Sequence, residues 1–317
     1  MKKVFEANFK MEDLGPLAYI LGIRVVRDRP NRTLYLVQDG YVERILERFG
    51  MGECAPAPTP VAVGVELQKV PLPEDVPHSQ WMKESCPYRQ AVGSLMYAMV
   101  STRPDIATAV GMLSRYLDCP QWHHWVAAKR VFRYLRGTTK YGLQLGKGGM
   151  QLSAWSDADW AGDVDTRRST SGYVLQLGGS VVSWSSKRQE IVALSTTESE
   201  YIALTRAAQE VLWVGGVLAE LGYDPEAVPV VVKGDNQGAL GLAKNPEFHP
   251  RTKHIAVRYH WIRDLVKPGL VQVEYVQSAM MLADMMTKPL DRVKFEQARS
   301  RLGMVQVQVP KNPVGNA

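Results

Sequence analysis

Three aspartates lie within seven residues in the stretch Ala154–Asp163, where two tryptophans accompany them. Asp157 stands at the end of a strand-like run, whereas Asp159 and Asp163 lie further into an Ala-Gly loop. An aspartate at a strand end is commonly explained by turn chemistry, which suits Asp159 and Asp163 as residues that shape the loop. A carboxylate in this position is also a ligand for a divalent cation, and we take Asp157 as the first candidate for that role.

A second acidic candidate lies near the start of a long helical pattern. Glu200 shares one line of the helix with the residues at i+4, i+7 and i+11, which are Leu204, Ala207 and Val211. The nearby Glu198 lies on a more mixed face. An acid on the apolar stripe is costly unless it is paired or bound to a cation, so Glu200 is the better candidate. The alternative is a structural carboxylate that the helix dipole stabilises.

Two further acids complete a candidate metal site. Asp235 follows a strand-like run and precedes a short helical pattern, a place typical of a helix N-cap, and Asp284 is an acid in an apolar helical turn. Acids from two strand ends and two helices can converge at one edge of a sheet, where they would repel one another unless cations were bound. Carboxylates suit Mg²⁺ or Mn²⁺. Two such ions, about 3.5–4 Å apart, would activate a water for phosphodiester hydrolysis without a protein nucleophile.

The elements that must position these acids form a mixed α/β plan in the second half of the chain. Alternating and helical patterns predict three strands, a long helix that begins near Thr196 or Thr197 and ends before Gly222, and then further strands and helices. The predicted strands are 152–157, 172–177, 181–185, 228–232 and 270–276, and the later helices follow Asp235 and span 254–266 and 292–302.

The first half has a different organisation. The patterns predict a hairpin over 17–38, a helix from Asp39 to Gly50, an extended connector over 53–73 and three helices between 88 and 137. The Gly-containing stretch 137–149 marks the domain boundary. On the last of these helices the basic residues are either a solvated face or contacts to phosphates; they include Lys129, Arg130 and Arg133.

Composition limits the function classes. The 317 residues carry a net charge of +6 and a sequence pI of about 9.1, which suits a polyanionic partner. Three separated cysteines predict neither a disulfide framework nor a zinc site. No signal-peptide core and no apolar run of membrane-spanning length is evident, so we expect a cytoplasmic or nuclear protein without a membrane partner.

The order of several motifs resembles the C-terminal fragment of a copia-type LTR retrotransposon Pol polyprotein, covering residues 8 to 303 or so. The second half is similar to its ribonuclease H domain, and the first half to the end of its reverse transcriptase region. The matching blocks are Trp155–Asp163, Arg167–Tyr173, Ser195–Leu204, Asp235–Gln237, Thr252–Ile255, Arg258–His260, Ala283-Asp284 and Thr287–Leu290, and in the first half Met11–Gly15, Leu21–Ile23, Gly93–Tyr97, Thr102–Asp105 and Tyr134–Thr138.

The resemblance implies a ribonuclease H-like mixed sheet with flanking helices, preceded by a smaller α+β region like a reverse transcriptase thumb or connection. The expected domains are 1–145, 146–303 and a disordered tail 304–317. The implied activity is two-metal hydrolysis of the RNA strand of RNA–DNA hybrids, with two Mg²⁺ or Mn²⁺ ions. The implied catalytic and metal-binding residues are Asp157, Glu200, Asp235 and Asp284.

Further expectations concern partners and departures from the family. Arg167 and Arg168 are candidates for contact with the hybrid, because they follow the first aspartate in the same loop. No Tyr-x-Asp-Asp polymerase motif occurs, so no polymerase activity is expected of this chain, and the missing polymerase part of Pol or a Pol subunit is a candidate partner. Ala256 replaces the acid usual in relatives, and no late His is evident. The alternatives are therefore a catalytically silent retroelement remnant that only binds nucleic acid and a purely structural role for the thumb-like half.

Overall fold

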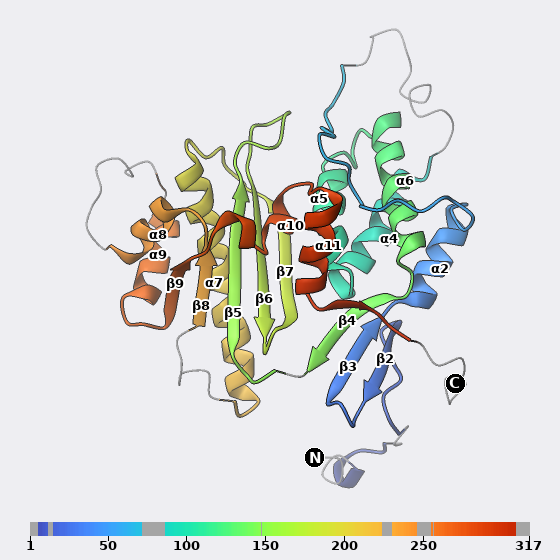
Figure 1. Cartoon of the computed structure of the whole chain (residues 1–317), viewed down its shortest axis with the longest axis horizontal. Coiled ribbons are helices and arrows are strands. Elements are labelled where there is room, and N and C mark those ends of the chain that lie inside the picture. Colours follow the sequence, from blue (N-terminus) through green and yellow to red (C-terminus); the bar gives the residue numbers. More distant parts are fainter. Residues whose placement is uncertain are drawn as a thin grey trace.

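The fold has two five-stranded sheets, one in each half of the chain (Figure 1). The computed structural model describes residues 6–11, 15–71, 86–146, 148–223, 230–245, 255 and 257–308. The first sheet, sheet A, has the order β1-β2-β3-β4-β10 and is antiparallel throughout. Its strands are β1 (Tyr19–Ile20), β2 (Ile23–Asp28), β3 (Thr33–Val37), β4 (Tyr141–Gly146) and β10 (Met304–Gln306).

The predicted hairpin is present as β2 and β3, and the Asp28 side chain closes its turn by accepting hydrogen bonds from the backbone and side chain of Asn31 at 3.2 and 2.7 Å. The connector after the first helix contains no helix or strand over residues 51–71, as its lack of periodicity predicts. The helices of this half are α2 (Asp39–Arg48), α4 (Tyr88–Ser101), the 3₁₀ turn η1 (Pro104–Ile106), α5 (Ala107–Ser114) and α6 (Trp122–Gly137).

The second sheet, sheet B, is the mixed sheet that the patterns predict. Its order is β7-β6-β5-β8-β9. Strand β6 is antiparallel to the central strand β5 and to the edge strand β7, while β8 and β9 continue the sheet from β5 in parallel. The strands are β5 (Leu152–Asp159), β6 (Thr170–Leu177), β7 (Ser180–Arg188), β8 (Val230–Gly234) and β9 (Val271–Tyr275). The predicted strand 228–232 includes Pro229, which lies outside the described residues.

Helices cover both faces of sheet B. On one face α7 packs across β5, β6 and β8 with α8 and α9 beside it, and on the other α10 and α5 contact the β5–β7 half (Figure 1). Side chains alternate accordingly, so that Ala154 belongs to the core under α7 and Trp155 to the core on the opposite face. The elements are α7 (Thr196–Glu220), α8 (Gln237–Lys244), α9 (Val257–Val266), the 3₁₀ turn η4 (Ser278–Met280), α10 (Asp284–Thr287) and α11 (Arg292–Arg301).

The long helix α7 is apolar over a membrane-spanning length, although the sequence analysis predicts no such run. By length and composition alone it could cross a membrane, since its best 18-residue window has a mean hydropathy of 1.2. Half of that window is buried inside the protein, which is the position of a core helix. Its apolar character is therefore accounted for by packing on sheet B.

The prediction of a disordered tail from residue 304 is wrong at its start. Met304–Gln306 form β10, which pairs with β4, and Val307 is buried. The helix before it, α11, also contacts the first half: Phe295 packs edge-on against Tyr134, with ring centroids 5.5 Å apart. β10 has only three residues, too few to show the alternation that predicts a strand, and the free edge of β4 supplies its partner. Residues 309–317 lie outside the described residues, and the domain limits stay a prediction.

Candidate metal centre

Asp157 occupies the central strand, two residues before β5 ends, and is almost completely buried. Its Oδ2 accepts a hydrogen bond from the Thr287 hydroxyl of α10. Helix α10 comes this close because the residue paired with Asp157 on β6 is Gly172. A Cβ there would lie 2.6 Å from Met286 Cβ and 2.7 Å from Thr287 Cγ2. The absence of a side chain at 172 therefore positions Thr287 against the carboxylate.

Glu200 lies in the first turns of α7, and the acid two residues before it has a separate task. The hydroxyl of the N-cap residue Ser195 accepts a hydrogen bond from the Glu198 backbone at 3.1 Å, while Glu198 Oε2 accepts one from the Leu194 backbone at 2.6 Å. This arrangement satisfies amide groups at the helix start, as a capping box does. Glu198 is even more buried than Glu200, so burial alone would not have distinguished the two. Its capping contacts leave Glu200 as the acid that faces the sheet edge.

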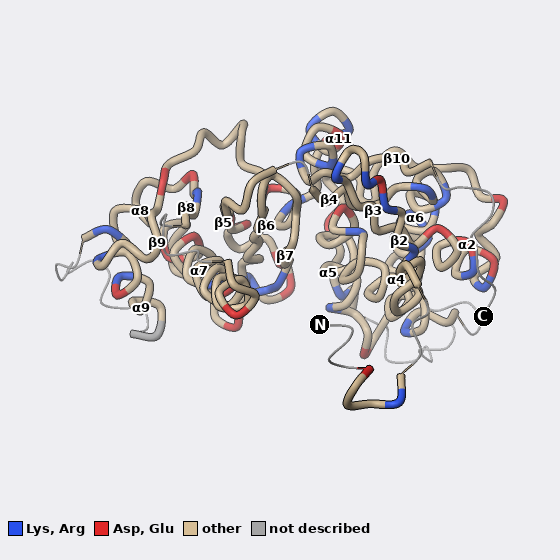
Figure 2. Tube along the Cα trace, turned by 90° about the horizontal axis from the view of Figure 1, so that it is seen from below, with Lys and Arg blue, Asp and Glu red and all other residues tan. Residues whose placement is uncertain are grey.

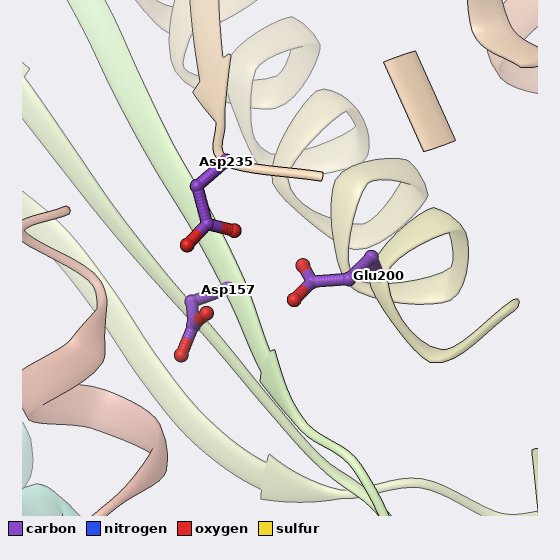
Figure 3. Close-up of side chains that lie close together, drawn as sticks. All are labelled: Asp157, Glu200 and Asp235. Atoms are coloured by element: carbon purple, nitrogen blue, oxygen red, sulfur yellow. The ribbon is translucent and has the colours of Figure 1, made fainter. Parts of the chain in front are cut away.

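Asp235 follows the last residue of β8, at the same edge of the sheet. Considered by itself, this aspartate was expected to cap the next helix, but the N-cap of α8 is Asn236, whose side chain accepts a hydrogen bond from the Ala239 backbone at 3.0 Å. Asp235 Oδ2 instead accepts a hydrogen bond from the Ser278 hydroxyl at 2.7 Å. Its carboxylate also faces Asp157 and Glu200 (Figure 3).

The side chains of Asp157, Glu200 and Asp235 converge from a strand, a helix and a second strand end (Figure 3). One carboxylate oxygen of each lies within 4.8 Å of one of each of the others. Burial, together with the charges of Asp157 and Asp235, raises the pKa of Glu200 to about 9. Burial likewise raises the pKa of Asp157 to about 6, although the Lys288 ammonium opposes that rise. Deprotonating all three acids at once is therefore unfavourable in the absence of a cation.

The donor set fits a hard divalent cation. Three carboxylates supply only oxygen ligands, which Mg²⁺ and Mn²⁺ prefer over nitrogen or sulfur. A cation among them would remove the repulsion that raises the pKa of Glu200 and Asp157. Among the described residues, this is the one group of three or more acids, histidines or cysteines close enough to hold an ion.

Asp284, the fourth predicted ligand, does not join this cluster. It is the first residue of α10, and its Oδ1 lies 2.8 Å from the Lys288 Nζ. The same Nζ lies 3.9 Å from Asp157 Oδ2, so one lysine stands beside both carboxylates. The sequence reading assigned no role to Lys288, Thr287 or Ser278, although the Thr-Lys-Pro-Leu block was among the matched motifs. A lysine four residues after an acid at a helix start was the available signal.

The other two aspartates of the opening stretch shape the loop. Asp163 is buried and accepts hydrogen bonds from the Arg188 guanidinium and from the Thr166 hydroxyl. Asp159 lies over Gly162, where a Cβ would be 1.8 Å from its Oδ2. These contacts agree with the loop-shaping role that the sequence suggests for both residues.

The basic residues proposed for nucleic-acid contact have different surroundings. The guanidinium of Arg130 donates to the Thr59 hydroxyl at 3.0 Å, and Arg133 donates to the Ala55 carbonyl at 2.7 Å, so both hold the connector. Lys129 lies over the rings of Trp122 and Trp125. In the loop after the first aspartate, Arg167 is exposed and Arg168 half-buried. Contact of any of the five with nucleic acid stays a prediction, and Ala256 lies outside the described residues.

Basic residues also gather on α11, a concentration that the sequence reading did not single out (Figure 2). Arg299 donates to the Tyr134 hydroxyl at 3.0 Å, and Arg301 donates to the Met280 carbonyl at 2.9 Å. Lys294 is exposed. Part of this charge therefore joins α11 to both halves of the chain.

Solved ribonucleases H align with less than half of the chain. The RNase H1 of Halobacterium salinarum NRC-1 is 20% identical, covers 43% of this chain and 94% of its own, and has a TM-score of 0.32. At that level the likeness is weak, and the ribonuclease H-like fold class rests on the mixed strand order of sheet B and its flanking helices. No family model matches the chain.

Curated relatives cover almost the whole chain. It is 47% identical over 304 residues to the retrovirus-related Pol polyprotein from transposon TNT 1-94 of Nicotiana tabacum, covering 96% of this chain and 23% of that protein. It is 41% identical to the Pol polyprotein from transposon RE2 of Arabidopsis thaliana, over 95% of this chain and 20% of that one. The putative transposon Ty5-1 protein YCL074W of Saccharomyces cerevisiae is 31% identical over 67% of each chain.

The chain thus spans about a fifth of the length of the Pol polyproteins that it matches. The matched range includes the acids of the candidate metal centre, the capped start of α7 and the Thr-Lys-Pro-Leu block after α10. The chain belongs to the copia-type retrotransposon Pol polyprotein family.

Proposed function

We propose that this chain is a metal-dependent endonuclease that hydrolyses the RNA strand of RNA–DNA hybrids during retrotransposon reverse transcription. The observation that carries the proposal is the convergence of Asp157, Glu200 and Asp235 at one edge of sheet B. Family membership supports the choice of substrate, because reverse transcription of an element's RNA produces a hybrid whose RNA strand has to be removed. Asp284 and two Mg²⁺ or Mn²⁺ ions belong to the same proposal.

Each residue of the centre has a defined task in this mechanism. Bound divalent ions would supply an activated water and stabilise the leaving oxygen of the phosphodiester. Asp157, fixed by the Thr287 hydroxyl, and Asp235, fixed by the Ser278 hydroxyl, present oxygen ligands from two adjacent strands. Glu200 presents a third from α7. Because strands and a packed helix hold these ligands, little rearrangement is needed on binding.

Cleavage of a labelled RNA–DNA hybrid in Mg²⁺ or Mn²⁺ tests the proposal. Asp157→Asn and Asp235→Asn are each expected to reduce the rate by roughly a hundredfold or more, since the loss of a metal ligand removes several kcal/mol of transition-state stabilisation. Asp264→Asn is the matched control, because Asp264 is exposed on α9 and outside the cluster. A chelator should abolish cleavage by the unaltered protein.

The outcomes separate this function from its alternative. If cleavage survives both cluster substitutions, the site assignment is wrong. If the unaltered protein binds the hybrid in a salt-sensitive manner without cutting it under any divalent ion, the chain is a nucleic-acid-binding remnant instead. Replacement of both Arg167 and Arg168 should weaken hybrid binding and reduce its salt dependence; an unchanged salt dependence would exclude them from the interface.

A further inference from the structure

The ammonium group of Lys288 lies between two carboxylates, only one of which belongs to the acidic cluster. Lys288 Nζ lies 2.8 Å from Asp284 Oδ1 and 3.9 Å from Asp157 Oδ2. Asp157 belongs to the cluster with Glu200 and Asp235, whereas Asp284 does not. Lys288 therefore touches the cluster on one side and separates the fourth carboxylate from it on the other.

The backbone holds Lys288 in this position. It is the C-cap of α10, and its amide donates to the Asp284 carbonyl at 3.1 Å. The preceding residue, Thr287, is buried and fixed both by its hydrogen bond to Asp157 and by the close approach of α10 to Gly172. The stem of Lys288 therefore starts beside the cluster. Its side chain is 41% exposed, so that the ammonium has a path into solvent.

The charges at the centre favour a resident cation. The Lys288 ammonium lies within ion-pair distance of both Asp157 and Asp284. A charged amine and a divalent ion neutralise the same carboxylates, so they compete wherever both need the same oxygen.

We propose that Lys288 is a built-in counter-cation of the metal centre, and that a second divalent ion has to displace its ammonium from Asp284. The proposal rests on the proposed function. A first ion can use the oxygens of Asp157, Glu200 and Asp235, because Lys288 lies closer to Asp284, at 2.8 Å, than to Asp157, at 3.9 Å. A further ion needs additional oxygen ligands, and the Asp284 carboxylate is already engaged. The two ions should therefore bind in separate steps, a stronger one and a weaker one.

Calorimetric titration of the full chain with Mn²⁺, without nucleic acid, tests this directly. The unaltered protein should show two steps. In Lys288→Met the second step should tighten by about tenfold or more, since the competing charge is gone. Lys294→Met is the matched control: it removes the same charge from an exposed position on α11 and should leave both steps unchanged. Lys288→Arg, which keeps the charge, should retain a weak second step.

Thermal unfolding provides a second measurement. Without metal, Lys288→Met should unfold at a lower temperature than the unaltered protein, because the acids lose their counter-cation, and saturating Mn²⁺ should close most of that gap. If Lys288→Met does not fold, the same titration of Lys288→Gln decides the question.

Two failures remain distinguishable. If the unaltered protein binds no Mn²⁺, the metal centre and the role of Lys288 are both wrong. If it binds Mn²⁺ but Lys288→Met binds the second ion no more tightly than Lys294→Met does, the metal centre stands and the counter-cation proposal is overturned. A weaker second step in Lys288→Met overturns it as well, because the lysine would then assist metal binding.

Discussion

The metal-free protein should become less stable as the pH rises, and Glu200→Gln should remove much of this dependence. The pKa of Glu200 is raised to about 9 in the folded chain from an ordinary value of 4.5. Between these values the folded state holds a proton that the unfolded state has lost. The contribution of this group to stability is therefore fully present below pH 4.5 and is lost progressively as the pH rises toward 9.

The size of the effect follows from proton linkage. One proton taken up on folding changes the free energy of unfolding by about 1.4 kcal/mol per pH unit. From pH 5 to pH 8 the unaltered protein should thus lose about 4 kcal/mol relative to Glu200→Gln, whose amide is neutral throughout. Asp157, whose pKa is raised to about 6, adds a similar slope below that pH in both proteins.

Urea unfolding in a chelator, followed by tryptophan fluorescence at several pH values, measures this difference. Glu220→Gln, at the exposed end of α7, is the control and should parallel the unaltered protein. Saturating Mg²⁺ should flatten the difference, because a bound ion keeps Glu200 deprotonated. If Glu200→Gln and the unaltered protein show parallel profiles in the chelator, burial and the neighbouring charges of Asp157 and Asp235 do not raise the pKa of Glu200.

Two other substitutions test the scaffold. Asp105→Asn breaks a fully buried ion pair with Arg103, in which the two charged atoms are 2.8 Å apart. It should lower the free energy of unfolding by about 3–5 kcal/mol, measured by urea unfolding. A loss of less than about 1 kcal/mol would contradict this. Gly172→Ala places a methyl group against α10 and should cost roughly 1–3 kcal/mol and reduce both Mn²⁺ affinity and hybrid cleavage. Unchanged metal affinity in a destabilised Gly172→Ala would show that α10 does not position the centre.

Patterns of period two and 3.6 were sufficient to predict the strands of sheet B, the hairpin of sheet A and helix α7. The preference for Glu200 was also accessible from the sequence, through the apolar line of Leu204, Ala207 and Val211, all of which are buried. These features depend on local spacing, which a single sequence displays.

Contacts between distant segments were not accessible in the same way. Asp235 and Asn236 are both good N-cap residues, and only the tertiary hydrogen bond from Ser278 separates their roles. The basic face of α6 suggested phosphate contact, but the carbonyl and hydroxyl groups that Arg130 and Arg133 bind belong to a connector without periodicity. The i,i+4 spacing indicates the Asp284–Lys288 pair, but the position of this pair beside Asp157 depends on the packing of α10 on sheet B, which spacing does not predict.

The pairing of β10 with β4 has a consequence for how the chain is made. Sheet A acquires its last strand only from residues 304–306, although its other strands precede residue 147. During synthesis the edge of β4 therefore stays open while all of sheet B emerges, and exposed strand edges favour association with other chains. A ribosome that stops before residue 304 would release a sheet B whose strands are all present beside a sheet A that lacks one. Sheet A is therefore complete only after residues 304–306 have been synthesised.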